Sequence, residues 1–562
     1  PASKQTILYK NTVIASMPTS LTPELYYLSN FRTVLAWLGE RYADLLTAEE
    51  QTFISNFETV EWRAQALLVR MIMRRGCHFR LSKLDYPEIG DCLSAARPLL
   101  ELGWISEQMP LTAVEVAELL RKDELLAHLP LSDRRSSQKK TALLEQLLAQ
   151  DLPAQPFSNW CPALNDRLLS LQIDELCNRL RLMFFGNLAQ GWSEFVLADL
   201  GIYRYESVDI TPESRGFRSR QDLEDYLHLR DLRVRFEAGE PVESVLPPLL
   251  AFSSANSYLR SRQSKQLFHL AQHLEKCGEL EQALAVYQRS EYSEARWRQV
   301  RVLEQLGRDA DAYQQALAFS ALPKSDEECQ RLERALPRLQ RKLGFPAERR
   351  PKPIEADRID LTLPMPAHGS VEVAVRDHIS TEQAPVHYVE NTLLCSLFGL
   401  LCWDAIFAPL PGAFFHPFHS GPVDLYSADF YSRRQQLFDA CLARLQQPDY
   451  TQLIVQRYRE KVGIQSPFVF WTLLDEPLLE MALHCIPAQH LEACFTRLLR
   501  DIKANRSGMP DLIQFYPAER RYRMIEVKGP GDRLQDNQKR WLAFAAEQGI
   551  PVEVCYVSWD AA

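Results

Sequence analysis

The pattern of hydrophobic and polar positions predicts helices through most of the first two thirds of the chain. In residues 24–108, apolar residues recur at i, i+3 and i+4, the spacing of a helix that buries one face. Residues 111–150 predict a helix, a short extended segment and a second helix. The helical spacing continues over residues 165–343. We therefore expect this part of the chain to be mostly α-helical.

Two segments within the helical region are similar to each other. Around Gly278 and Gly307, Leu-x-x-x-Gly is followed by Ala at the fifth position, which resembles a tetratricopeptide helical hairpin. Each pair of helices would bury an apolar face on its neighbour and leave a curved surface for a partner. The prediction is a scaffold of helical repeats.

The final third of the chain differs in texture. Five prolines in residues 345–366 cannot sustain a helix, so we expect a domain linker there. A helix that carries Glu390 follows, and then a loop-rich stretch over 410–423.

The last 60 residues predict a different arrangement. Residues 511–516 and 522–528 are strand candidates joined by a short turn, which is typical of a β-hairpin. A helix over 535–548 and a strand over 552–559 come next. This order predicts a small α/β domain.

Composition and charge limit the partners. Glycine accounts for only 21 of 562 residues, which argues against turn-dense barrels and sandwiches. A net charge of −9 makes nucleic acid a poor partner on total charge alone. Three stretches are nevertheless rich in basic residues: 62–84, 134–140 and 215–235.

Cysteine spacing and hydropathy exclude further classes. The 12 cysteines show no CxxC and no His pairs at finger spacing, so we expect neither zinc fingers nor a disulfide framework. The N-terminus has no apolar signal segment, and the longest apolar run, 393–408, is too interrupted to span a membrane. We expect an intracellular protein, in the cytoplasm or nucleoid if it is bacterial.

The predicted hairpin carries the residues for phosphodiester hydrolysis. Pro-Asp at Asp511 and Glu-x-Lys at Glu526 and Lys528 match the spacing of PD-(D/E)xK nucleases. Residues two apart on a strand share a face, so Glu526 and Lys528 lie on one side. Carboxylates hold Mg²⁺ or Mn²⁺, and a lysine can orient the attacking water or offset phosphoryl charge. The alternative is an edge-strand charge pair.

Longer motifs make a resemblance to known families specific. NRSGMPDL, IEVKGPGDRL and Gln538 with Trp541 and Leu542 resemble the VRR-NUC nuclease domain. VENTLLCSLFGLLCWDAIF, together with the 111–150 module, resembles the Fanconi-associated nuclease family. That family implies a SAP-like module and helical repeats before a nuclease that cuts DNA near a 5′ flap or 5′ end. Eukaryotic members carry a ubiquitin-binding zinc finger, which is not evident here, so the resemblance implies a bacterial homologue.

The same resemblance implies the roles of individual residues. Asp511, Glu526 and Val527 would bind the metal, Lys528 would be the catalytic lysine, and Glu390 would be a further active-site carboxylate and metal ligand. Candidate DNA contacts are Arg63, Arg70, Arg74, Arg75, Arg134, Arg135, Lys139, Lys140, Arg506 and Gln538. We interpret His387, His416 and His419 as loop or core histidines, because a hard metal ion does not need them.

The predicted fold is a mostly helical N-terminal arm followed by an α/β nuclease domain. Its segments are 1–108 (helical, DNA-binding), 109–152 (SAP-like), 153–344 (tetratricopeptide-like), 345–366 (linker) and 367–562 (VRR-NUC). The predicted function is a metal-dependent nuclease acting on branched or flapped DNA in repair, including interstrand crosslinks. Two alternatives stay open: a Holliday-junction resolvase, and a DNA-binding or protein-docking scaffold with an inactive nuclease domain.

Overall fold

The computed structural model describes residues 25–131, 137–150, 152–192, 203–346, 356–365 and 369–560. They fall into two units, residues 1–202 and 203–562. The helical repeats and the C-terminal sheet therefore belong to one unit, and no division between units falls in the predicted linker.

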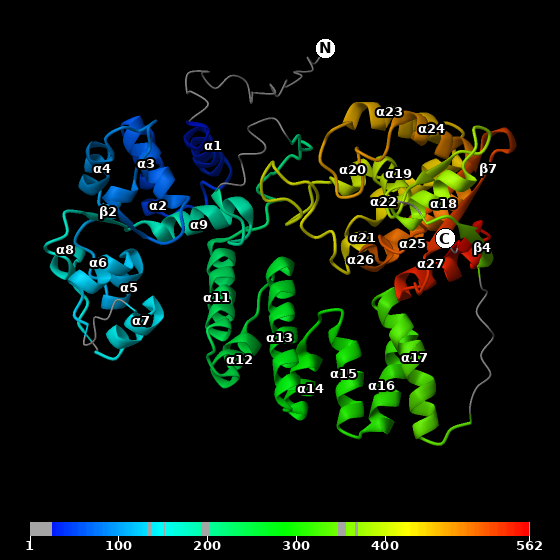
Figure 1. Cartoon of the computed structure of the whole chain (residues 1–562), viewed down its shortest axis with the longest axis horizontal. Coiled ribbons are helices and arrows are strands. Elements are labelled where there is room, and N and C mark those ends of the chain that lie inside the picture. The colour runs from blue at the N-terminus through cyan, green and yellow to red at the C-terminus, as the bar shows by residue number, and fades with distance from the viewer. Residues whose placement is uncertain are drawn as a thin grey trace, which may run out of the picture. The chain divides into compact units, whose positions relative to one another are not determined.

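The first unit is helical with a small antiparallel sheet (Figure 1). Its helices are α1 (Tyr26–Arg41), α2 (Ala48–Thr59), α3 (Trp62–Ile72), α4 (Cys92–Glu101), α5 (Ala113–Leu119), α6 (Lys122–His128), α7 (Lys140–Leu148), α8 (Phe157–Trp160) and α9 (Asp174–Phe185). The strands β1 (His78–Arg80), β2 (Ile105–Ser106) and β3 (Leu168–Leu171) are ordered β1-β3-β2. The prediction of helices alone over 24–108 is wrong here, because such short strands show no period-two pattern.

Helices α5, α6 and α7 form the predicted SAP-like module around a core of their own. Val116, Leu125 and Leu143 are fully buried in that core. The indole of Trp160 donates a hydrogen bond to the carbonyl of Leu111 at 2.8 Å and so attaches α8 to the start of the module. The predicted second helix corresponds to α7, but the predicted first helix is wrong as a single element, because the extended backbone at Leu120 and Arg121 divides it into α5 and α6.

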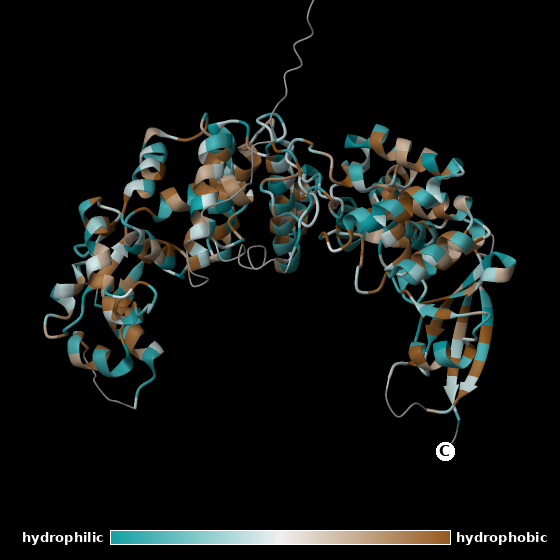
Figure 2. Ribbon diagram, turned by 90° about the horizontal axis from the view of Figure 1, so that it is seen from above, coloured by the Kyte–Doolittle hydropathy of each residue, from teal (hydrophilic) through white to brown (hydrophobic). Residues whose placement is uncertain are grey.

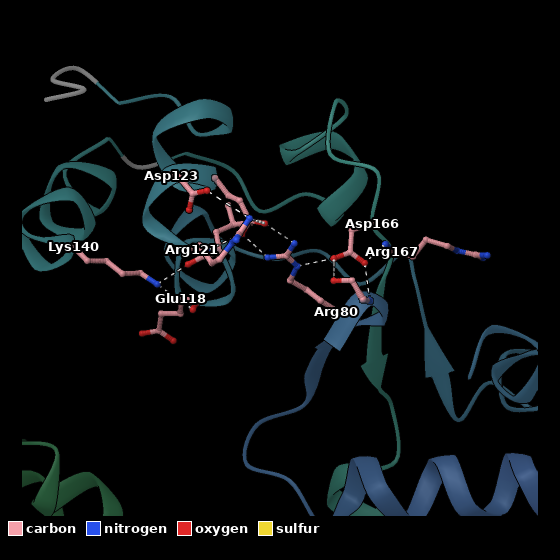
Figure 3. Close-up of polar contacts among 10 residues, drawn as sticks. Arg80, Glu118, Arg121, Asp123, Lys140, Asp166 and Arg167 are labelled. Atoms are coloured by element: carbon pink, nitrogen blue, oxygen red, sulfur yellow. Dashed lines mark hydrogen bonds and ion pairs between the residues drawn. The ribbon is translucent and has the colours of Figure 1, made fainter. Parts of the chain in front are cut away.

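A buried ion-pair network connects this module to the small sheet (Figure 3). Arg80, at the end of β1, donates to both carboxylate oxygens of Glu124 at 2.5 and 2.8 Å and to Asp166 at 2.7 Å. The hydrogen bonds from Arg80 lower the pKa of Glu124 to about 2. Glu124 also accepts from the Arg121 amide at 2.8 Å, at the start of α6. Arg80 thus has a structural role inside the unit and does not belong to the basic surface predicted over 62–84.

The second unit begins with a row of antiparallel helices (Figure 1). They are α11 (Arg220–Glu237), α12 (Val242–Ala251), α13 (Ser257–Cys277), α14 (Leu280–Arg289), α15 (Ala295–Gln305), α16 (Asp309–Ala321) and α17 (Asp326–Lys342). Gly278 and Gly307 turn the chain between the helices of each self-similar pair at φ of +87° and +71°, which favours glycine. The two predicted hairpins, α13–α14 and α15–α16, are confirmed.

A five-stranded mixed sheet follows, in the order β4-β8-β7-β6-β5. The strands are β4 (Asp357–Leu363), β5 (Val386–Tyr388), β6 (Leu512–Tyr516), β7 (Arg521–Lys528) and β8 (Val552–Trp559). β7 and β8 run parallel, connected by α27 (Asp536–Glu547), as the order of predicted elements requires. β4 lies inside the predicted linker and pairs with β8. The prediction of a linker is therefore wrong for residues 357–363, because the prolines flank this strand and do not interrupt it.

The sheet, whose strands carry both hydrophobic and hydrophilic residues (Figure 2), is accompanied by helices of the same unit. They are α18 (Val371–Ile379), α19 (Leu393–Leu401), α20 (Trp403–Ile406), α21 (Phe430–Arg433), α22 (Gln435–Ala443), α23 (Tyr450–Lys461), α24 (Glu476–Cys485), α25 (Ala488–Arg500) and α26 (Ile502–Asn505). Every residue of α19 is buried. Glu390 was expected within this helix, but it lies in the turn that precedes α19.

Replacing Arg80 should destabilise the first unit. Arg80→Met leaves Glu124 and Asp166 buried without their cation, which should lower the free energy of opening by about 3–5 kcal/mol. Amide hydrogen exchange of β1 and α6 in the full chain measures this. Because the pKa of Glu124 is depressed, wild-type protection should be lost as pH falls from about 4.5 towards about 2, and the variant should lack this dependence.

Arg121→Ala is the matched control. Its guanidinium is exposed and lies 3.4–3.5 Å from Asp123 and Glu124, so its removal should cost less than about 1 kcal/mol. Equal losses for the two variants would contradict a structural role specific to Arg80.

Candidate active site

The β6–β7 hairpin brings the two predicted carboxylates together. Asp511 immediately precedes β6, and the antiparallel register pairs Leu512 with Ile525, so Asp511 lies beside Glu526 on β7. The Asp511 Oδ2 accepts a hydrogen bond from the Val527 amide at 2.8 Å. The backbone of β7 thus fixes the position of the Asp511 side chain.

The positive charge of Lys528 compensates the charge of the Glu526 carboxylate, which is buried away from water. Its ammonium Nζ lies 2.8 Å from Glu526 Oε1, and both side chains are buried. Apart from this ion pair, the two oxygens of Glu526 have no hydrogen-bond partner among the described residues. A buried carboxylate without partners is costly unless a cation balances it.

Burial makes both carboxylates hard to ionise. It raises the pKa of Asp511 to about 6, with the charge of Glu390 adding to the effect and the Val527 hydrogen bond and Lys528 opposing it. Burial also raises the pKa of Glu526 to about 7, the charge of Asp511 acting in the same direction and Lys528 against it. Carboxylates whose pKa values are raised towards neutral pH are typical of functional sites.

A turn before α19 adds Glu390 to this group. β5 pairs with β6, Tyr388 opposite Leu512, and the Val389 amide donates to the Asp511 carbonyl at 2.9 Å. The Tyr388 hydroxyl donates to Glu390 Oε2, and the Asn391 amide group donates to Glu390 Oε1 at 3.1 Å. Glu390 is therefore attached to the strand that carries Asp511.

The segment before Asp511 packs against α27 at one glycine. Gly508 has φ +87°, and a Cβ there would lie 2.7 Å from the carbonyl carbon of Asn537. The buried indole of Trp541 donates to the Asn505 carbonyl at 3.0 Å. The motif residues Gly508 and Trp541 thus hold the start of the hairpin against the helix.

Two residues of the same motifs make contacts other than those predicted. Arg506 donates to the Pro467 carbonyl at 2.9 Å and to the Tyr426 hydroxyl. Gln538 accepts from the Gln535 amide at 2.8 Å and caps the start of α27. Both bonds are structural, so the predictions of a phosphate contact and an active-site polar group gain no support from the geometry.

The carboxylate group suits a hard divalent cation. Oxygen ligands are what Mg²⁺ and Mn²⁺ prefer, and the buried oxygens of Glu526, whose partner in the structure is Lys528, are those that a cation would satisfy. No three His, Cys, Asp or Glu side chains of the described residues are already arranged to hold a metal ion. In this state Lys528 supplies the compensating charge.

The candidate DNA contacts of the first unit separate into two groups. Arg63, Arg74, Arg75 and Lys139 are exposed, although Arg63 pairs with Glu61 at 3.4 Å and Arg74 donates to the Lys83 carbonyl at 3.2 Å. Arg70 instead donates to Glu88 at 3.0 Å and lies over the Tyr27 ring, and Lys140 donates to the Leu120 carbonyl at 2.8 Å. Arg70 and Lys140 are therefore occupied within the unit. Arg134 and Arg135 lie outside the described residues.

Several arginines of the basic stretch over 215–235 are buried or paired with neighbouring acids, whereas Arg218 and Arg230 are exposed. Arg215 is buried, with 3% of its surface exposed. Arg220 pairs with Glu224 at 3.2 Å, and Arg235 pairs with Glu240 at 3.0 Å. The sequence count of arginines overstated the charge that this stretch offers to a partner.

The histidines contribute to the fold. His416 and His419 stack at 3.9 Å, and burial lowers the pKa of His419 to about 4. The His387 ring lies 5.9 Å from that of Phe515, and burial lowers its pKa as well. These positions agree with the interpretation of core and loop histidines.

Three residues near the carboxylates were not anticipated from the sequence. They are Tyr388 and Asn391, which hold Glu390, and Glu372 at the start of α18, whose charge acts on Asp511. Asn391 directly follows Glu390, so its place in the turn was a usable signal. Tyr388 and Glu372 become recognisable only once β5 and α18 are placed beside the hairpin.

Three family models match separate segments of the chain. Family models match residues 25–106 (FAN1, HTH domain), 110–160 (Fanconi anemia-associated nuclease SAP domain) and 445–559 (VRR-NUC domain). A VRR-NUC domain whose sheet gathers Asp511, Glu526 and Lys528 defines a nuclease, and nucleases of this type generally use divalent metal ions.

Relatives along the whole chain identify the family. The Fanconi-associated nuclease 1 homologue of Pseudomonas aeruginosa is 54% identical over 96% of this chain and 97% of its own length. The Arabidopsis thaliana homologue is 25% identical over 94% of this chain and 67% of its own length. The crystal structure of paFAN1 bound to DNA with a 2-nucleotide 5′ flap and a gap has a TM-score of 0.86 and 54% identity, covering 97% of this chain and all of that one. The chain belongs to the Fanconi-associated nuclease family, which confirms the resemblance and the predicted fold class.

Among the described residues, no helix combines the length and apolar character needed to cross a bilayer.

Affinity for a divalent cation should depend steeply on pH. Because their pKa values are raised, Asp511 and Glu526 are partly protonated in this pH range, and a cation must displace those protons to bind. Mn²⁺ affinity should therefore rise about tenfold per pH unit between about pH 5.5 and 7. Conversely, the stability of the metal-free chain should fall as pH rises from about 4.5 to about 7 and level off above it, because ionisation of the buried pair disfavours the fold. Calorimetric Mn²⁺ titration and thermal unfolding in EDTA measure the two effects.

Lys528→Met provides the control for this pH dependence. The Lys528 charge lowers both pKa values, so its removal should shift the rise in Mn²⁺ affinity to higher pH. A flat wild-type profile, or a shift to lower pH in the variant, would contradict this description of the site.

Proposed function

We propose that the chain is a structure-specific endonuclease and 5′–3′ exonuclease that cuts one DNA strand beside a 5′ flap or 5′ end. The observation that carries this proposal is the convergence of Asp511, Glu526 and Lys528 at one end of the β6–β7 hairpin, with Glu390 attached to the same strand. Phosphodiester hydrolysis needs an oriented water and charge compensation at the phosphoryl oxygens, and this residue set can provide both.

Each residue has a role within this proposal. Asp511, Glu526, Glu390 and the main chain of Val527 would hold Mg²⁺ or Mn²⁺, which supplies electrophilic charge at the phosphate and acidifies a bound water. Lys528, paired with Glu526 at 2.8 Å, would donate a hydrogen bond to the attacking water or to a phosphoryl oxygen once the carboxylate is otherwise satisfied. Burial keeps bulk water from competing with these contacts.

Recognition of DNA would rest on shape and on the phosphate backbone. The crystal structures of paFAN1 with 1- and 2-nucleotide 5′ flaps support a flapped or branched DNA as the substrate. In the first unit, Arg63, Arg74, Arg75 and Lys139 are exposed and suited to phosphate contacts. We further propose a role in DNA repair, including repair of interstrand crosslinks, in the cytoplasm or nucleoid.

The cleavage pattern should distinguish this proposal from a junction resolvase. With Mn²⁺, the wild-type chain should cut a 5′-flap DNA on one strand, a few nucleotides into the duplex, and should cut an immobile four-way junction poorly. Asp511→Asn should reduce cleavage at least about 100-fold, because it removes a metal ligand, while it leaves DNA affinity near wild type. Product mapping on labelled substrates and binding in Ca²⁺ measure the two properties.

The controls for this experiment are EDTA and a 3′-flap substrate. Paired, symmetric nicks in the junction with an intact flap would favour the resolvase. Undiminished flap cleavage in excess EDTA would reject metal-dependent hydrolysis.

Two neighbouring lysines should differ in their effect on DNA affinity. Lys139 is exposed, so Lys139→Ala should weaken binding to all sequences and reduce the slope of log affinity against log salt by about 0.9. Lys140 is held by the carbonyls of Glu118 and Leu120, so Lys140→Met should lower the stability of the SAP-like module and leave the slope unchanged. Fluorescence anisotropy over a salt series measures the slope, and equal slopes for the two variants would contradict the assignment.

A further inference from the structure

The turn that carries Glu390 contains an unusual backbone conformation. Asn391 has φ +55°, and it is one of two non-glycine residues with positive φ among the described residues, the other being Arg520. Positive φ is unfavourable for most side chains and is tolerated best by Asn and Asp. Such a conformation persists where surrounding contacts hold it.

The side chain of Asn391 makes contacts on two sides. Its amide nitrogen donates to Glu390 Oε1 at 3.1 Å. Its carbonyl oxygen accepts from the Met509 amide at 3.0 Å, two residues before Asp511. A single side chain therefore bridges Glu390 to the segment that enters β6.

Tyr388 completes the set of contacts from the other side of Glu390. Its hydroxyl donates to Glu390 Oε2, so each carboxylate oxygen accepts one hydrogen bond from a neighbour in the chain. Each oxygen still has acceptor capacity left, because a carboxylate oxygen has two lone-pair sites. Two donors on opposite oxygens fix the plane of the carboxylate.

We infer that Asn391 and Tyr388 are positioning residues that orient the Glu390 carboxylate towards the cation site shared with Asp511. This inference rests on the proposed function, in which Glu390 is a metal ligand. Neither residue touches the reacting atoms. Hydrogen-bond partners of metal ligands typically account for 10–100-fold in metal affinity or activity, which sets the size of the expected effect.

The test measures binding of Mn²⁺ to the whole chain by calorimetry, in the absence of DNA. Asn391→Gly permits the positive φ but removes both side-chain hydrogen bonds, and Tyr388→Phe removes one donor. Each should weaken Mn²⁺ binding at least about tenfold. Arg520→Gly is the matched control, since it makes the same change at positive φ on the exposed hairpin turn, and it should bind Mn²⁺ like the wild type.

Cleavage provides the second readout. Positioning of a ligand predicts that Asn391→Gly and Tyr388→Phe raise the Mn²⁺ concentration for half-maximal flap cleavage about tenfold, with most of the rate recovered at saturating Mn²⁺. A merely structural defect would lower the maximal rate and leave the metal dependence unchanged, and that result would overturn the inference. If Asn391→Gly fails to fold, Asn391→Asp replaces it, because Asp tolerates positive φ and can accept from Met509 but cannot donate to Glu390.

Glu390→Gln separates failure of the inference from failure of the proposed function. If this variant loses Mn²⁺ affinity while Asn391→Gly and Tyr388→Phe match Arg520→Gly, Glu390 is a ligand that needs no positioning, and only the inference is overturned. If Glu390→Gln itself binds like the wild type, Glu390 lies outside the metal site, and both the inference and its assigned role are wrong.

Discussion

The hydrogen bond from the Val527 amide to Asp511 Oδ2 is the contact on which the rest of the site depends. It joins a carboxylate at the start of β6 to the backbone of β7, between the two residues whose side chains complete the site. A slip of one residue in this pairing would turn Glu526 and Lys528 to the opposite face of the sheet. The strand register, specified by the surrounding hydrophobic core, is therefore also what specifies the chemistry.

Burial of the carboxylates favours cation binding at this site, and it also lowers the stability of the metal-free fold. Glu526 is fully buried, and its pKa and that of Asp511 are raised because water no longer solvates their charges. Lys528 offsets part of this cost in the absence of another cation. A carboxylate pair that is poorly satisfied by protein has a strong tendency to bind a hard metal ion. Part of the free energy of cation binding therefore comes from satisfying carboxylate oxygens that are poorly solvated in the metal-free fold.

The basic residues of the first unit show why charge in a sequence is an incomplete guide to partners. Arg80 and Arg75 belong to the same basic stretch, yet Arg80 is buried between Glu124 and Asp166 while Arg75 is exposed. Lys139 and Lys140 are adjacent and differ in the same way. Whether a cation is available to a phosphate depends on acids and carbonyls distant in sequence, which fold next to it.

Local spacing in the amino-acid sequence was enough to predict several elements of the fold. Helical periodicity gave the repeat pairs, alternation and turn chemistry gave the β6–β7 hairpin, and residues two apart on β7 placed Glu526 and Lys528 on one face. Tertiary structure alone decided the contacts between distant segments. β4 pairs with β8 although prolines flank it. The turn at Glu390 is attached to Asp511 through Val389 and to Met509 through Asn391. Periodicity reports which face of an element is buried, but it carries no information about which remote segment covers that face or accepts its hydrogen bonds.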